Sequence, residues 1–354
     1  MNFLNLHILR SMPMSNTNAD DTGAPKSVVN GSVPRGRNSS QARKRHVRVA
    51  FELDSPAETT YRSKQLPTLV TNRAIGLLAE QDVEVDDPTR TKIEKALAKK
   101  LGELTSGAED KKATLLWVEE AEVAEMVAKV VAHHTDIELA AKDIVGGQTR
   151  SLSIAAFGRF FANSPQSGID AAIQVAHSMT THRRQSELDY FTAVDDLSAS
   201  FGDHKGAGHL DVAEFTSGVF YEFCALDVRQ LLHNWADRDA DDAAARLQQL
   251  IKALILTIPG GKKNSTAPMT VPALILAVGS SQPLSYASAF ERPVPESDDG
   301  FEQASVLRLI DYHAKVAALD PELTATDWRS GMGIADPLPL DAVTSSIAAA
   351  ALTR

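Results

Sequence analysis

The chain has a single cysteine, Cys224, among 354 residues, so it can form neither an internal disulfide nor a cysteine-rich zinc site. No run of about 18 apolar residues occurs, which argues against a membrane-spanning helix. The opening MNFLNLHILRSM lacks the basic start and the small-residue cleavage site of a signal peptide. These absences predict a protein of the reducing cytoplasm, in which Cys224 is a small buried hydrophobe.

Catalytic signatures are also lacking. The Gly-Gly-Lys sequence at 260–262 resembles a phosphate-binding loop, but the glycine required five positions earlier is Leu256, and no Ser or Thr follows the lysine. Asp195 and Asp196 are adjacent, so on a strand they point to opposite faces and could share a metal ion only across a bulge. We therefore expect no cofactor, no metal ion and no catalytic residues.

Positive charge is scarce overall and concentrated near the amino end. The chain carries a formal net charge of -10. Residues 1–48 hold eight basic and two acidic side chains, a balance of +6, which leaves -16 for the remainder. Phosphate contacts require local Lys and Arg, so the charge distribution predicts one localised polyanion site rather than indiscriminate nucleic-acid binding. A solvated basic helix is the alternative interpretation.

Hydrophobic patterns predict an α+β protein of one elaborated domain or two. Residues 2–9 alternate as a strand with one buried face, and residues 13–38, rich in Pro, Gly, Ser and Asn, are expected to form a long loop. Asn38, Ser39 and Ser40 are candidate N-caps for a helix that carries several basic residues. The start of such a helix is a candidate phosphate-binding site.

The region from about 58 to 182 is predicted to be mainly helical. Its expected elements are helices at 65–80, 87–104, 113–133 and 170–182 and a strand at 150–157. Strands at 189–197 and 209–223 around the Gly-rich turn 198–208 predict a long β-hairpin. The last expected elements are a helix at 240–256, a strand at 271–278, a helix at 303–318 and an alanine-rich tail.

Motifs along nearly the whole chain occur in the order found in one family. They are NFLNLHIL (2–9), SSQARKR (39–45), FGRFF (157–161), AHSMTTH (176–182), DYFTAVDDL (189–197), HLDVAEFTSGVFY (209–221), IPGGK (258–262), ASAFE (287–291) and DDGF (298–301). On these segments the chain resembles CasC, the backbone subunit of the type I-E CRISPR Cascade complex. Between about 58 and 150 the resemblance is mainly one of helical character.

The resemblance implies a hand-shaped α+β protein. Its palm, of modified RNA-recognition (ferredoxin-like) topology, would comprise 1–57 and 220–354, with helical fingers at 58–183 and a thumb hairpin at 184–219. Such proteins are not enzymes; they assemble head to tail along the guide RNA (crRNA) spacer and present it in segments for pairing with target DNA. The implied partners are the crRNA, target DNA, other copies of the chain, other Cascade subunits and a recruited helicase-nuclease.

The resemblance also implies guide contacts for individual residues. Lys44 and Arg45 match backbone contacts, with Ser40 and Gln41 as helpers. Phe160 stands where the family commonly has a methionine wedge beside a displaced base. Phe191 and Thr192 occupy thumb positions at the same kink. Further RNA contacts are expected at Lys26, Arg35, Arg37, Arg48 and Arg159. Two family features are absent. Ala19 stands where the family often has an arginine, and Glu291 is followed by Arg292 where the family has lysines.

Two other functions remain open from the residues themselves. One is a metal-dependent RNA nuclease that uses Asp195, Asp196 or Asp211 with His209, because fold alone does not decide function. The other is a purely structural protein whose basic segment is only a solvated surface.

Overall fold

The computed structural model describes residues 1–55, 58–104, 115–140, 145–193 and 209–353. The chain divides into two compact units, each built from several segments. The first unit comprises Met1–Val47, Gln174–Ala225 and Ile251–Ala350, and the second comprises Arg48–Ile173, Leu226–Leu250 and Ala351–Arg354. Among the described helices, none is both long and apolar enough to cross a membrane.

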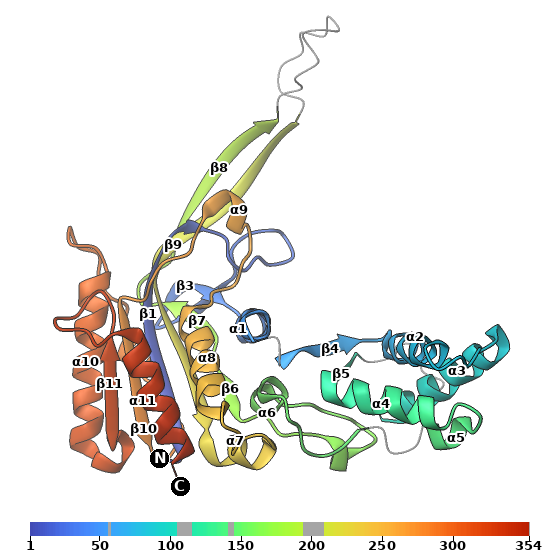
Figure 1. The fold of residues 1–354 in the computed structure, drawn as a ribbon. Helices are drawn as coiled ribbons and strands as arrows, with labels where there is room; N and C mark the ends of the chain where they lie inside the picture. Colours follow the sequence, from blue (N-terminus) through green and yellow to red (C-terminus); the bar gives the residue numbers. More distant parts are fainter. Residues whose placement is uncertain (56–57, 105–114, 141–144, 194–208, 354) are drawn as a thin grey trace, which may run out of the picture. The chain divides into compact units, whose positions relative to one another are not determined.

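A nine-stranded sheet organises the first unit (Figure 1). Its path runs β11-β10-β1-β9-β7-β3-β2, and β6 and β8 also pair with β9. The strands are β1 (Phe3–Ser15), β2 (Ser27–Asn30), β3 (Val33–Asn38), β6 (Ile173–Val175), β7 (Ser178–Thr180), β8 (Gln185–Ala193), β9 (His209–Asp227), β10 (Leu274–Ser280) and β11 (Thr326–Ser330). Neighbours on the path that are far apart in sequence, such as β1 and β10, pair antiparallel.

Helix α10 (Glu302–Leu319) packs against one face of this sheet. Its buried Val306, Leu309 and Val316 join apolar side chains of β1, β9 and β10 in one core cluster. The short helix α9 (Lys263–Thr266) also belongs to this unit. Residues of both units are found in α1 (Ser40–Asp54), α8 (Ala243–Leu256) and α11 (Leu340–Leu352). The strand and helix expected at 271–278 and 303–318 are thus confirmed as β10 and α10.

Strand β1 is buried on both faces, whereas its alternating sequence predicts one buried face. Asn5 and His7, the polar positions of the pattern, are almost fully buried. The Asn5 amide donates to the hydroxyl of Ser280 at 2.7 Å. The His7 ring bonds the hydroxyl of Tyr221 at 2.9 Å and stacks on Tyr286 with 3.9 Å between centroids. These partners lower the cost of burying the Asn5 amide and the Nδ1 atom of His7.

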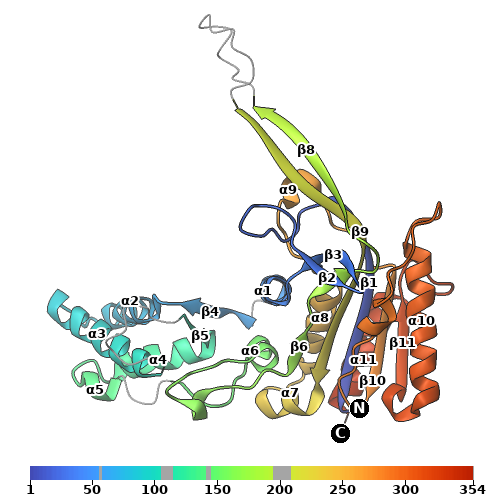
Figure 2. The same ribbon diagram turned by 180° about the vertical axis from the view of Figure 1, so that it is seen from behind.

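The predicted long hairpin is confirmed as β8 and β9, which pair antiparallel from Gln185↔Ser217 to Ala193↔His209. The far end of β9 belongs to the sheet, so one 19-residue strand serves both the core and the hairpin. Figure 2 shows the two strands leaving the sheet together. The predicted turn at 198–208 lies outside the described residues.

The second unit is mainly helical, as its periodicity predicts. It contains α2 (Leu66–Ala79), α3 (Asp87–Glu103), α4 (Glu120–Ala132), α5 (Ile137–Ala140), α6 (Leu152–Phe157), α7 (Val228–Asn234) and a small sheet of β4 (Thr60–Ser63) and β5 (Leu116–Glu119). One face of each of α2, α3 and α4 contributes to a shared apolar core that includes Phe161. The helix expected at 113–133 begins only at Glu120, because residues 116–119 pair with β4 instead.

Three other sequence predictions are wrong: two of the segments form strands of the large sheet, and the third forms a capped helix. The loop expected at 13–38 contains the end of β1 and the paired strands β2 and β3. The helix expected at 170–182 is replaced by β6 and β7, since Thr180 pairs with Phe220 of β9. The strand expected at 150–157 is helix α6, which begins where the Ser151 hydroxyl accepts from the Ile154 amide at 3.2 Å.

Candidate nucleic-acid interface

Helix α1 begins as its sequence predicts, with a serine cap. The Ser39 hydroxyl accepts a hydrogen bond from the Ala42 amide at 3.3 Å, and the Ser39 amide donates to the side chain of Asn18 at 2.8 Å. A hydroxyl that accepts from the third helical residue satisfies one of the unpaired amides of the first turn. The cap therefore fixes where the helix starts relative to β3.

A buried ion cluster fixes the orientation of α1. Glu222 of β9 forms ion pairs with Arg43 of α1 at 2.7 Å and with Arg10 of β1 at 3.3 Å. All three side chains are at most 2% exposed. Arg10 also donates to the backbone carbonyls of Ile255 and Thr270. Because one carboxylate balances two guanidinium groups in a desolvated site, each side chain depends on the others.

With Arg43 turned inward, other residues of the same helix turn face solvent. Gln41 and Arg45 are exposed, and Ser40 and Lys44 are half-buried. Lys26 joins them from the chain before β2, where its carbonyl accepts from the amide of Arg37 at 2.8 Å. We call this set the α1 surface; its members are Lys26, Arg37, Ser40, Gln41, Lys44 and Arg45.

His177 borders the α1 surface and is not among the contacts that the sequence predicts. Its ring Nδ1 lies 3.2 Å from the backbone nitrogen of Ser40 and 3.3 Å from the guanidinium of Arg37. Desolvation, and then the charges of Arg37 and Lys26, lower the pKa of His177. His177 belongs to the motif AHSMTTH, which the sequence does show. The position of His177 beside α1 depends on the pairing of β7 with β3, at Arg37↔Met179 and Asn38↔Ser178.

Arg35 does not belong to the α1 surface, although its position and charge predict a phosphate contact. Its side chain is fully buried and donates to the carbonyls of Asn30 at 3.1 Å, Thr180 at 3.0 Å and Phe290 at 2.8 Å. Desolvation lowers its pKa. Arg35 therefore joins three segments of the first unit, and its guanidinium is not accessible to a ligand.

Arg48 lies in the second unit and is engaged with neighbours there. Its guanidinium pairs with Glu52 at 2.9 Å, one helical turn on, and lies 5.4 Å from the ring centre of Trp117. Only 17% of its side chain is exposed. An RNA contact by Arg48 would have to break or share this ion pair.

Arg159 is also buried, whereas the side chain of the next residue, Phe160, is exposed to solvent. Its guanidinium donates to Glu122 at 2.7 Å and to the carbonyl of Gly146 at 2.9 Å, and its backbone pairs with Ile169 in both directions at 2.7 and 2.8 Å. The Phe160 ring is 83% exposed. The prediction that Arg159 contacts RNA does not fit its burial, whereas Phe160 is available as an apolar wedge.

Phe191 and Thr192 lie on opposite faces of the hairpin, since successive strand residues alternate. Phe191 stands opposite Asp211 and is 43% exposed. The face of Thr192 also carries exposed Tyr190 and its cross-strand partner Val212. This face therefore carries exposed apolar side chains at Tyr190 and Val212, and the two predicted thumb residues, on opposite faces, cannot contact the same group at once.

The residues of the nuclease hypothesis are only partly described. Asp195 and Asp196 lie outside the described residues, and Asp211 lies on β9. In the part of the chain that the structure describes, no group of three or more His, Cys, Asp or Glu side chains is placed to hold a metal ion.

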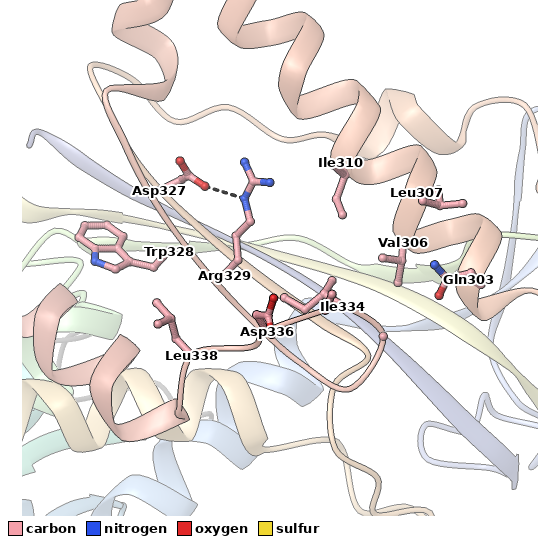
Figure 3. Close-up of a pocket in the computed structure, with 12 residues that line it drawn as sticks. Gln303, Val306, Leu307, Ile310, Asp327, Trp328, Arg329, Ile334, Asp336 and Leu338 are labelled. Atoms are coloured by element: carbon pink, nitrogen blue, oxygen red, sulfur yellow. Dashed lines mark hydrogen bonds and ion pairs between the residues drawn. The ribbon is translucent and has the colours of Figure 1, made fainter.

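A cavity of about 520 Å³ lies elsewhere in the first unit, between α10 and β11 (Figure 3). Val306, Ile310 and Ile334 line it together with the Asp327–Arg329 pair, whose atoms are 2.7 Å apart. None of the predicted guide contacts lines this cavity.

These features define a class: an α+β protein in which a large antiparallel sheet supports a projecting hairpin and a basic helix start. The family described as CT1975-like protein matches residues 4–338, and the chain belongs to this family. No curated protein matches the chain.

Solved structures with this fold come from CRISPR complexes. A chain in a "CRISPR RNA-guided surveillance complex, pre-nicking" is 26% identical, with a TM-score of 0.81 over 99% of this chain and 100% of that one. A chain in a "CRISPR RNA-guided surveillance complex" is 24% identical, with a TM-score of 0.62 over 99% of both chains, and shows the fold alone. The resemblance to a CRISPR backbone subunit is confirmed at this level, while the type I-E subtype stays a prediction.

Proposed function

We propose that the chain is a guide-RNA-binding backbone subunit of a CRISPR surveillance complex and not an enzyme. The observation that carries the proposal is the full-length match to a chain of an RNA-guided complex at 26% identity. The α1 surface supports it, because it gathers four cationic side chains on a protein whose net charge is -10.

The α1 surface suits a sugar-phosphate backbone rather than bases. Lys44 and Arg45 supply charge, and Ser40 and Gln41 supply hydrogen-bonding groups at the positive end of the α1 dipole. Such contacts hold a strand at any sequence, so sequence recognition falls to base pairing between guide and target. Glu222 contributes indirectly, by holding Arg43 and hence the orientation of the helix.

We extend the proposal to assembly. Copies would join head to tail along the crRNA spacer, a heterologous contact that does not close. The β8–β9 hairpin would act as the thumb and the α2–α4 region as the fingers, with Phe160 as the wedge beside a displaced nucleotide and Phe191 or Thr192 at the same kink. Target DNA, other subunits of a type I-E complex and a recruited helicase-nuclease would be the remaining partners, in the cytoplasm.

The first test measures RNA binding at several salt concentrations. The double variant Lys44→Ala/Arg45→Ala should bind single-stranded RNA about 10-fold more weakly, because two phosphate contacts are lost. The slope of log affinity against log salt should fall by about 1.4, at about 0.7 per phosphate on a single strand. Filter binding with several unrelated RNA sequences gives both quantities.

The control is Lys99→Ala/Lys315→Ala, which removes the same net charge from exposed positions on α3 and α10. It should leave the slope unchanged. Equal slopes for both double variants would refute guide binding by the α1 surface. Cleavage of complementary RNA with Mg²⁺ that disappears in Asp195→Ala would instead support the nuclease.

A further inference from the structure

His177 lies where β6 and β7 are joined, and its ring touches the start of α1. Nδ1 is 3.2 Å from the Ser40 backbone nitrogen and 3.3 Å from a guanidinium nitrogen of Arg37. The side chain is nevertheless exposed to solvent. It therefore belongs to the same surface as three residues implicated in RNA binding on other grounds, namely Lys26, Arg37 and Ser40.

The two contacts determine which ring nitrogen carries the proton. A backbone N–H and an arginine guanidinium are both donors with no acceptor capacity. Nδ1 must therefore offer its lone pair, and the neutral ring carries its hydrogen on Nε2. A charged ring would carry a hydrogen on Nδ1 as well, and this N–H would face the two donors of Ser40 and Arg37. The lowered pKa of His177 agrees with the neutral form.

The Nε2–H group points away from these contacts. On a five-membered ring the substituents of the two nitrogens diverge, so Nε2 faces away from Ser40 and Arg37. Among the described residues, no hydrogen-bond partner is found for it. The charges of Arg37 and Lys26 act on His177, and both side chains are donors with no acceptor capacity. A ligand of this surface must therefore offer acceptor oxygens.

We propose that His177 is a guide-binding residue whose Nε2–H donates to an oxygen of the ribose–phosphate backbone. This inference rests on the proposed function and adds a neutral donor to the cationic contacts. Two oxygens fit the chemistry, a phosphate oxygen and the ribose 2′-hydroxyl. Only the hydroxyl distinguishes RNA from DNA.

Two substitutions separate the roles of the ring nitrogens. In His177→Asn the amide lies near the place of Nδ1, so it can still accept from Ser40 and Arg37 but offers no outward donor. In His177→Gln the amide reaches the place of Nε2 and keeps that donor. His133→Asn is the matched control, because His133 is an exposed histidine at the end of α4 in the second unit.

The affinity of the full chain for labelled single-stranded RNA, and for DNA of the same sequence, is measured for each variant. We expect His177→Asn to bind RNA about 10-fold more weakly, the loss of one hydrogen bond to a charged or polar oxygen, and His177→Gln to stay within about threefold of the wild type. A loss for RNA alone assigns the 2′-hydroxyl, and an equal loss for DNA assigns the phosphate.

The inference is overturned if His177→Asn binds RNA as tightly as the wild type. It is also overturned if His177→Gln loses as much as His177→Asn, because a donor at the place of Nε2 would then not preserve binding. In both cases the proposed function is still supported if the Lys44→Ala/Arg45→Ala variant binds RNA more weakly than the wild type. If that double variant also binds normally, the proposed function itself fails.

Discussion

At the scale of single residues, neighbours in the sequence have opposite environments. Arg159 is 4% exposed and Phe160 is 83% exposed. The reason is the ion pair of Arg159 with Glu122 and the backbone pairing with Ile169, which hold the start of this loop against the second unit. Phe160 therefore follows a residue that is held in place, and its exposed ring is available to stack on a nucleobase.

Phe160→Ala should weaken RNA binding without affecting folding. Stacking of one base on an aromatic ring contributes about 1–3 kcal/mol, so affinity should fall about 5- to 150-fold if the ring contacts a base. The measurement is RNA affinity together with the fluorescence of 2-aminopurine placed at each position of the strand.

The control is Phe161→Ala, one residue further on. Phe161 is 1% exposed, and its removal should cost about 3–5 kcal/mol of folding stability through lost burial and a cavity. Unchanged affinity and fluorescence in Phe160→Ala would mean that the exposed ring has no role in stacking.

At the scale of elements, α1 combines a buried and an exposed set of cations. Arg43 is buried, and the carboxylate of Glu222 forms ion pairs with both Arg43 and Arg10. Arg45 is exposed and accessible to a ligand. Charge alone cannot make this distinction, because the basic residues lie side by side in ARKR. The helix packing decides it, since only one side of α1 faces β1 and β9.

Glu222→Gln should destabilise the protein strongly. Removing the carboxylate charge leaves Arg10 and Arg43 buried without compensation, at a cost of about 3–5 kcal/mol. Urea unfolding measures the change in the free energy of unfolding. Asp311→Asn, which breaks the exposed Lys315–Asp311 pair, is the control and should change it by at most about 1 kcal/mol. A cost below about 1 kcal/mol for Glu222→Gln would show that α1 is held by other contacts.

At the scale of the whole molecule, buried histidines couple folding to pH. Burial, with a further effect of His313, lowers the pKa of His7 to about 3. Burial also lowers the pKa of His182 and His313. Because the folded state keeps these rings neutral, their contribution to stability is fully present above the unfolded value of about 6.5. It is lost as the pH falls below that value, since the unfolded chain then binds protons that the folded chain does not.

The free energy of unfolding should therefore fall between about pH 6.5 and about pH 3, by up to about 1.4 kcal/mol per pH unit from His7. His7→Phe keeps an aromatic ring against Tyr286 but cannot titrate, so its pH dependence should be weaker than that of the wild type. Urea unfolding at several pH values gives both curves. Parallel curves would contradict a neutral His7 in the folded protein.

The sequence by itself determined the family and those elements that have a clear local pattern. The hairpin follows from alternating strands around a glycine-rich turn, the start of α1 from a serine cap, and helices α2 and α3 from their periodicity. Motifs spread over the chain indicated a CRISPR backbone subunit. These features depend on neighbours in the sequence or on a family pattern.

Only the tertiary structure decided which polar residues are accessible and which segments without a strand pattern join the sheet. Residues 13–38 and 170–182 lack a clear strand pattern, and they form β2, β3, β6 and β7 because their partners in the sheet satisfy their backbone groups. The same pairing brings His177 to Ser40 and buries Arg35. A contact between residues more than 100 positions apart is set by the packing of the sheet, and no local pattern contains it.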